Sequence, residues 1–213
     1  MTPRVGRPPT TSREAIVERA LAMLDANGVD GLTMRELAAD VGVTPMALYR
    51  HVGDKESLLA LALDSTAEPF AAIEFPADPR QCMLEAMSVV YDTLVDRPWV
   101  PQALTVPQRI GRGALRITDA VVGAGLELTG DAHEATRAYR ALWSMTLGSV
   151  LTTIRLRSEM SADGPTWIAE LLDTLPSSEA PQLRASLADP TPPPTREDFR
   201  HNLSALIAGL FGP

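Results

Sequence analysis

The chain has too few cysteines and apolar runs for several classes of protein. Its 213 residues include one cysteine, Cys82, so an internal disulfide framework and a cysteine-based zinc site are both excluded. The longest mostly apolar run, residues 141–154, is shorter than the roughly 20 residues that span a bilayer. The N-terminal segment has two arginines but no apolar stretch behind them, so it is not a secretory signal. We therefore expect a globular protein of the cytoplasm that does not bind membranes.

The sequence also lacks the combinations of residues on which enzyme active sites depend. The three histidines, His51, His133 and His201, are far apart in the sequence. The segment GRGALR at Gly111 lacks the lysine and serine of a P-loop, and GAGLELTG at Gly123 follows no predicted strand. We expect no catalytic residue, no metal site and no cofactor, and a helical small-molecule enzyme is the alternative from a different class.

The negative charge of the chain is unevenly distributed along the sequence. The formal net charge is −8, which argues against a general binder of polyanions. Residues 1–55 contain seven basic and seven acidic side chains, so the whole excess of negative charge lies in residues 56–213. If the protein binds nucleic acid, the first 55 residues therefore form the contact.

Helical patterns dominate the N-terminal part. The capping-box patterns at residues 11–14 and 33–36 predict two helix starts, and Asn27-Gly28 and Gly42 predict the corresponding ends. The pair Thr44-Pro45 then supplies a cap and a first-turn proline for a third helix. Asp54 caps a fourth helix that runs towards Pro69. The turn between the second and third helices predicts a helix-turn-helix motif.

The remainder of the chain also has helical spacing, and no stretch keeps the alternation of a strand. Helices are predicted over residues 79–96, 109–124, 131–157 and 196–211. Residues 98–108 contain three prolines and predict a broken helix or a packed loop. Residues 176–195 are rich in proline and serine, and we expect them to be mobile, with one or two helical turns at 183–187.

The predicted fold is therefore all-α, with a three-helix helix-turn-helix domain for DNA binding at residues 11–62. A flexible basic arm, residues 1–10, precedes this domain. A larger helical domain for ligand binding and dimerisation follows it at residues 63–213.

The third predicted helix has two distinct faces. At about 100° per residue, Leu48 and Val52 point towards the first two helices. The outward face and its flank hold Pro45, Met46, Ala47, Tyr49, Arg50 and His51. A slim, apolar and cationic face suits a helix in the major groove of DNA, although the same pattern also describes an ordinary solvated helix face.

The expected DNA contacts extend beyond this helix to the second helix and to the arm. Arg35 can lean over the groove to a base, and the arm can enter a neighbouring minor groove. The residues that we expect at the DNA are Arg4, Arg7, Thr33, Arg35, Thr44, Pro45, Met46, Ala47, Tyr49, Arg50, His51 and Lys55.

The segment LTMRELAADVGVTPMALYRHVGDKESLLALA, residues 32–62, closely resembles the DNA-binding domain of TetR-family transcriptional regulators. It contains the family motifs L-T-x-R-x-L-A, G-V, L-Y-x-H-V and K-x-x-L-L in register. The resemblance implies phosphate contacts by Thr33, Tyr49, His51 and Lys55, and base-facing positions for Arg35, Pro45, Met46 and Ala47. The tetracycline repressors have an aromatic residue at the position of Arg50, so the family does not assign a role to this arginine.

Residues 97–154 and the ending DFRHNLSALIAGL resemble the ligand-binding domain of tetracycline-repressor-type members. This resemblance implies a homodimer in which the helices at 131–157 and 196–211 pair with their two-fold mates. The small residues that would permit close approach are Gly148, Ser149, Ala205, Ala208 and Gly209. Packing of these residues within one chain is the alternative.

Large apolar side chains with polar tips recur between residues 79 and 157 and suit a largely hydrophobic effector. The candidates are Met83, Met87, Tyr91, Trp99, Leu104, Tyr139, Trp143 and Leu147. A stripe of methionine or aromatic residues is more often plain core, and that is the alternative for each of them. Binding of a metal–tetracycline complex is not expected, because residues 62–132 contain no histidine to help hold the magnesium.

The sequence therefore predicts a homodimeric repressor that binds a palindromic operator and is released by a small, largely hydrophobic ligand. An activator or a ligand-independent DNA-binding regulator is the alternative, since repression depends on where the operator lies relative to a promoter.

Overall fold

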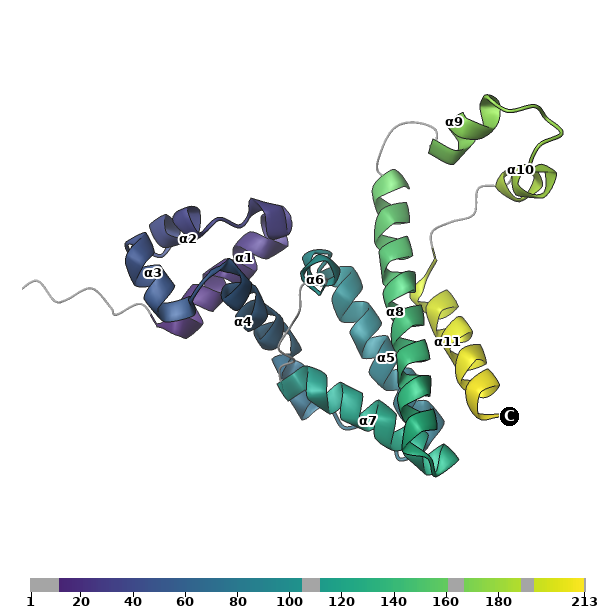
Figure 1. The fold of residues 1–213 in the computed structure, drawn as a ribbon, viewed down its shortest axis with the longest axis horizontal. Coiled ribbons are helices and arrows are strands. Elements are labelled where there is room, and N and C mark those ends of the chain that lie inside the picture. Colours follow the sequence, from purple (N-terminus) through teal and green to yellow (C-terminus); the bar gives the residue numbers. More distant parts are fainter. Residues whose placement is uncertain (1–11, 105–111, 161–166, 189–193, 213) are drawn as a thin grey trace, which may run out of the picture.

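The structure is a computed structural model that describes residues 12–104, 112–160, 167–188 and 194–212. All regular secondary structure within these ranges is helical, which confirms the predicted all-α fold (Figure 1). The elements are α1 (Arg13–Gly31), α2 (Met34–Asp40), α3 (Pro45–Val52), α4 (Lys55–Ala67), the 3₁₀ helix η1 (Glu68–Ala72), α5 (Pro79–Asp96), α6 (Trp99–Ala103), α7 (Arg112–Thr129), α8 (Ala132–Met160), α9 (Trp167–Asp173), α10 (Pro181–Leu187) and α11 (Arg196–Phe211).

Side-chain caps set the starts of the N-terminal helices. The oxygens of Thr33, Thr44 and Asp54 accept from the backbone N–H three residues later, at 3.2, 3.2 and 2.8 Å. These bonds confirm the predicted starts of α2, α3 and α4, because each satisfies an N–H that has no partner within its helix. The capping box predicted at residues 11–14 was wrong by one position: Ser12 caps α1 and accepts from Ala15 N at 3.1 Å. Thr11 lies outside the described residues.

Two glycines with positive φ bend the chain around the helix-turn-helix motif. Gly28, at φ 70°, interrupts the helical backbone of α1, which resumes for a short turn that ends at Gly31. The first helical stretch of α1 therefore ends at Gly28, as predicted, and a short second stretch follows the kink. Gly42, at φ 72°, forms the tight turn between α2 and α3, a conformation that costs glycine little.

Helices α1 to α4 enclose an apolar core that holds α3 in a fixed orientation. The fully buried side chains of this core include Ile16, Ala20, Leu24, Leu37, Leu48, Leu58 and Ala62. Burying a leucine contributes roughly 1.5–3 kcal/mol. The orientation of α3 is therefore fixed by packing over several helices.

In the larger part of the molecule, α5, α7 and α8 pack on one another, and α11 lies against α5 and α8 (Figure 1). Helices α9 and α10 lie beyond the C-terminal end of α8. Helix α10 is the short helix expected within residues 176–195, whereas α9 was not predicted. The broken helix expected at residues 98–108 appears as α6, and residues 105–108 lie outside the described ranges.

Helix α4 belongs to both parts of the molecule. Leu58 and Ala62, in its first half, are buried among α1 to α3, while its last residue, Ala67, is buried against the larger part. Gly113 of α7 crosses this last turn so closely that a Cβ atom there would overlap the carbonyl oxygen of Ala67. The predicted domain boundary between residues 62 and 63 thus lies inside one continuous helix.

Candidate nucleic-acid interface and ligand cavity

The two faces predicted for α3 are present in the structure. Leu48 and Val52 expose 0% and 2% of their surface, whereas Met46 exposes 66% and Tyr49 48%. Pro45, Arg50 and His51 are also exposed, and Ala47 is half-buried. A methionine and a tyrosine this exposed gain nothing from the domain's own core, so their presence on α3 fits a surface that contacts another molecule.

Two arginines on or beside this surface are not held by acidic side chains of the domain. Arg35 and Arg50 are exposed and make no ion pair within the described residues. Arg19 of α1 differs, because it donates to both carboxylate oxygens of Asp40 at 2.6 and 2.7 Å and thereby lowers the pKa of that carboxyl group. Guanidinium groups without an internal acceptor are available to phosphates or guanine edges.

Two of the predicted DNA contacts have hydrogen-bond partners within the domain. The hydroxyl of Thr33 donates to Glu36 Oε2 at 2.7 Å. The ammonium of Lys55 donates to the carbonyl oxygen of Val29 at 2.8 Å and is half-buried. Lys55 retains two further N–H groups, while Thr33 must release Glu36 before it can donate elsewhere. Arg4 and Arg7 lie outside the described residues.

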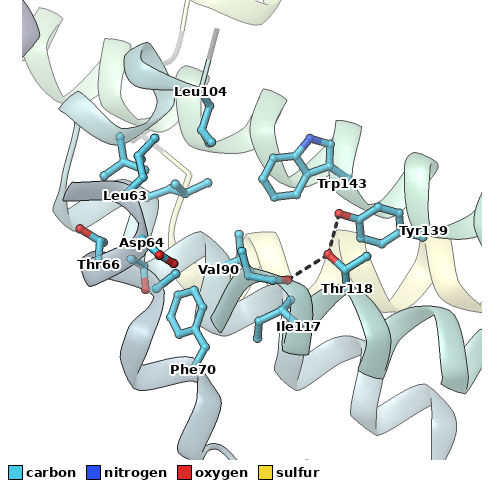
Figure 2. A pocket seen from close by; sticks show the side chains of 15 residues that line it. Leu63, Asp64, Thr66, Phe70, Val90, Leu104, Ile117, Thr118, Tyr139 and Trp143 are labelled. Atoms are coloured by element: carbon cyan, nitrogen blue, oxygen red, sulfur yellow. Dashed lines mark hydrogen bonds between the residues drawn. The ribbon is translucent and has the colours of Figure 1, made fainter. Parts of the chain in front are cut away.

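A cavity of about 290 Å³ lies between α4, α5, α6, α7 and α8 (Figure 2). It is lined mainly by apolar side chains, with a small set of polar groups at two sides. The lining residues are Leu63, Asp64, Thr66, Ala67, Phe70, Val90, Thr93, Leu94, Val100, Leu104, Ala114, Ile117, Thr118, Tyr139 and Trp143. A concave, largely apolar cavity with few polar groups is typical of a site for a small molecule.

The cavity wall is joined to α1 by polar contacts. The indole N–H of Trp99 donates to Asp25 Oδ1 at 2.7 Å, and a guanidinium nitrogen of Arg97 lies 3.9 Å from Asp25 Oδ2. Arg97 also donates to Oγ1 of Thr66, a lining residue of the cavity, at 3.3 Å. A displacement of the cavity wall near Thr66 can therefore be transmitted to α1 through the contacts of Arg97 with Asp25.

Comparisons with known proteins agree with this geometry. The profile of the family described as "Bacterial regulatory proteins, tetR family" matches residues 16–62. The chain is 29% identical to the HTH-type transcriptional repressor DrrR1 of Streptomyces coeruleorubidus, over 98% of this chain and 80% of the relative. Residues 16–62 form a TetR-family DNA-binding domain. A crystal structure of a possible TetR family transcriptional regulator from Streptomyces coelicolor A3(2) shares 25% identity, with a TM-score of 0.78 over 93% of this chain and 98% of that one.

A further TetR-family structure shares the fold over almost the whole chain. ActR from Streptomyces coelicolor, in complex with actinorhodin, superposes with a TM-score of 0.69 at 21% identity, over 96% of this chain and 97% of that one. The relatives are thus regulators and repressors, and the fold similarity extends well beyond the matched DNA-binding segment.

Three of the eight predicted ligand contacts line the cavity: Leu104, Tyr139 and Trp143. Met83, Met87 and Tyr91 are instead fully enclosed in the core. Tyr91 stacks on Phe199 with ring centroids 4.1 Å apart, and its hydroxyl lies 3.1 Å from that of Thr153. Trp99 is buried at Asp25, and Leu147 does not line the cavity. The stripe on α5 therefore packs the core, which was the alternative reading.

Lining residues on α4, η1, α5, α6 and α7 were not predicted from the sequence. Leu63 and Phe70 precede residue 79, where the predicted ligand-binding segment begins. On α7, the spacing of Ala114, Ile117 and Thr118 could have indicated a common face towards the cavity, since residues three and four apart share a helix face.

The packing of a single chain does not bury the predicted dimer residues on α8 and α11. Gly148, Ala205, Ala208 and Gly209 are exposed, and Ser149 is half-buried. A Cβ atom added at Gly148 or Gly209 would meet no atom within 4 Å. Leu151, one turn from Gly148, exposes 50% of its surface. The described parts of these two helices thus present small and apolar side chains to their surroundings.

No group of three metal-ligating side chains lies together within the residues described. None of the helices in those ranges is long and apolar enough to cross a membrane.

Proposed function

We propose that this chain is a homodimeric TetR-family repressor that binds a palindromic operator in the cytoplasm and releases it when a small, largely hydrophobic ligand occupies the cavity. The observation that carries the proposal is the division of α3 into a buried face and an outward face, with Met46 and Tyr49 exposed and Arg50 unpaired. Such a helix presents apolar groups for thymine methyls and cations for guanines or phosphates.

In this proposal residues 11–62 form the DNA-binding domain, residues 1–10 form a basic arm, and residues 63–213 bind the ligand and the second copy. Within the DNA-binding domain, Arg35, Pro45, Met46 and Ala47 face the bases. Thr33, Tyr49, His51 and Lys55 position the backbone, and Thr44 caps α3 at the groove. Base contacts determine sequence preference, whereas phosphate contacts mainly fix the register of the protein on the duplex.

The second copy would pack on the faces of α8 and α11 that carry Gly148, Ala205 and Ala208. Support comes from the exposure of these residues and from the empty space beyond Gly148 and Gly209. A two-fold contact of these helices would also cover Leu151 and the half-exposed parts of α11. The two α3 helices of such a dimer would read two half-sites of one operator.

Ligand control would act through α4 and the contacts around Arg97. The related ActR holds actinorhodin in its complex, which supports a small-molecule effector for a protein of this fold. Leu63, Asp64 and Thr66 of α4 line the cavity, and the same helix packs in the DNA-binding core through Leu58. A ligand that prefers one position of α4 would therefore shift the balance between DNA-competent and DNA-incompetent states.

Gel-shift titration with DNA from upstream of the protein's own gene tests the proposal. We expect a shifted complex that unlabelled fragment competes away and scrambled DNA of equal length does not. The absence of a shift even at low salt, where phosphate contacts are strongest, would contradict DNA binding. A specific shift that no candidate ligand reverses would favour the ligand-independent alternative.

A further inference from the structure

The hydroxyl groups that line the cavity all use their protons inside the protein. Three threonines, one each from α4, α5 and α7, line it. Each Oγ1 donates to the carbonyl oxygen four residues earlier: Thr66 to Ala62 at 2.9 Å, Thr93 to Val89 at 2.9 Å and Thr118 to Ala114 at 3.0 Å. A carbonyl oxygen can only accept, so each hydroxyl must be the donor.

The same reasoning fixes the direction of the bond between Thr118 and Tyr139, whose oxygens are 3.2 Å apart. Thr118 has a single hydroxyl proton, and it is directed to Ala114. Tyr139 must therefore donate to Thr118, so its phenolic oxygen can still accept a hydrogen bond but has no second proton to donate. Figure 2 shows this pair on the side of the cavity that also holds Trp143.

The opposite side of the cavity carries a negative charge. Asp64 is the one charged side chain among the 15 described residues that line the cavity. Its carboxylate has no ion-pair partner within the described residues, although Arg112 and Arg116 border the neighbouring cleft that Asp64 also lines. The side-chain donor in the lining is the indole N–H of Trp143, whose ring face also attracts cations.

From this arrangement we infer that the cavity selects an apolar molecule with one protonated amine, bound at Asp64, and with a flat ring system beside Trp143. A further donor on the ligand, such as a hydroxyl, would meet the lone pairs of Tyr139. The inference rests on the proposed function in taking this cavity as the effector site, and it adds the chemical class of the effector.

Anionic ligands are disfavoured by the same groups. A carboxylate or phosphate in the cavity would face the carboxylate of Asp64 and hydroxyl oxygens that have no proton to give. Of the described side chains in the lining, only the indole of Trp143 offers an N–H to replace the hydrogen bonds that the anion loses to water, and this cost opposes binding. The cavity should therefore bind a cationic ligand more tightly than its neutral analogue, and the neutral analogue more tightly than an anionic one.

Three probes with the same ring test this order: 1-naphthylmethylamine, 1-naphthalenemethanol and 1-naphthoic acid, each titrated by calorimetry into the full chain at neutral pH. We expect the amine to bind about fivefold more tightly than the alcohol, because Asp64 is exposed and an ion pair at an exposed carboxylate contributes modestly. Binding of the acid should be weaker than that of the alcohol.

The variant Asp64→Asn should lower the affinity for the amine to that for the alcohol and leave the alcohol unchanged. Asp173→Asn, at an exposed carboxylate of α9 outside the cavity, should change neither. Equal binding of acid and amine, no binding of the amine, or an unchanged preference in Asp64→Asn would each overturn the inference.

The gel shift on upstream DNA without any ligand separates this inference from the proposed function. If the operator shifts but the amine shows no preference, the ligand class is wrong and the DNA-binding proposal stands. If the amine binds as expected but no DNA fragment shifts, the proposed function is wrong while the selectivity of the cavity stands.

Discussion

The arginines of the DNA-binding domain differ in whether another side chain of the domain neutralises them. Arg19 forms two hydrogen bonds with Asp40, whereas Arg35, on the first turn of α2, is exposed and unpaired within the described residues. This difference separates an arginine that stabilises the contact between α1 and α2 from one that is free to read a base.

Replacing Arg35 with alanine should weaken operator binding by about 1–3 kcal/mol and relax the preference at one base pair, because a bidentate contact to a base edge is lost. Anisotropy titrations with operators changed one base at a time measure both effects. Arg19→Ala is the matched control and should keep the base preference, since its guanidinium is bound to Asp40. If Arg35→Ala bound every operator like the wild type, the assignment of α2 to the groove would be wrong.

For single residues, the sequence predicted which side chains of the helix-turn-helix motif are buried or exposed better than it predicted which side chains line the cavity. Rotation about one short helix separates Leu48 and Val52 from Met46 without any tertiary information, because a surface helix has one buried side. Tyr91 and Met87 also recur at helical spacing, but α5 is buried on more than one side. A repeated apolar face on such a helix cannot distinguish core from cavity wall.

At the scale of helices, α7 crosses the last turn of α4 so closely that no side chain fits at Gly113. Gly113→Ala should destabilise the protein by at least about 1–3 kcal/mol, because the added methyl group overlaps the carbonyl oxygen of Ala67 and α4 must move. Thermal unfolding measures the loss, and operator affinity should fall with it.

Gly123→Ala in the same helix is the control, since its Cβ meets no atom within 4 Å. This change should stabilise by about 0.5–1 kcal/mol. Equal melting temperatures of the two variants would show that the crossing is not tight.

A second contact between helices gives a dependence on pH. Arg200 of α11 donates to both carboxylate oxygens of Glu85 on α5, at 2.7 and 3.2 Å, and these hydrogen bonds lower the pKa of Glu85. A carboxyl group with a lower pKa in the folded state stabilises fully above its ordinary value of 4.5. The contribution is lost as the pH falls through the lowered value.

Glu85→Gln should therefore be less stable than the wild type by up to about 1 kcal/mol near pH 7, a value kept small because the side chain of Glu85 is 39% exposed. The difference should shrink towards about pH 3. Urea unfolding at both pH values measures it, and Glu127→Gln, at an exposed glutamate of α7, provides the comparison. The same difference at both pH values would exclude the Arg200 pair as its source.

Helix positions were largely predictable because caps, prolines and glycines act locally. The start of α5 at Pro79 and its end at Asp96 agree with the sequence, as do both ends of α11. Helix α7 extends to Thr129, beyond the predicted residue 124. Packing keeps the residues beyond 124 helical, and Gly125 is buried against Ala135. Tertiary contacts of this kind are not visible in a local pattern.

For the whole molecule, the proposed dimer depends on the exposed faces of α8 and α11. Ala208→Arg should convert a particle of twice the chain mass of 22.9 kDa into one of that mass, because a buried guanidinium without a partner opposes association. Light scattering after size exclusion measures the mass. Ala22→Arg, at an exposed alanine of α1, should leave it unchanged. A wild-type particle of single-chain mass would exclude the dimer at the concentration used.

The arrangement of the two DNA-reading helices in that dimer could not be derived from one chain, since it depends on how two copies pack. A hydroxyl-radical footprint of the wild-type protein on its upstream DNA measures it directly. We expect two protected half-sites related by a two-fold axis, with centres about 34–36 Å apart, one turn of DNA. Protection without two-fold symmetry, or no protection at a protein concentration that saturates the gel shift, would contradict the central claim that paired α3 helices read a palindromic operator.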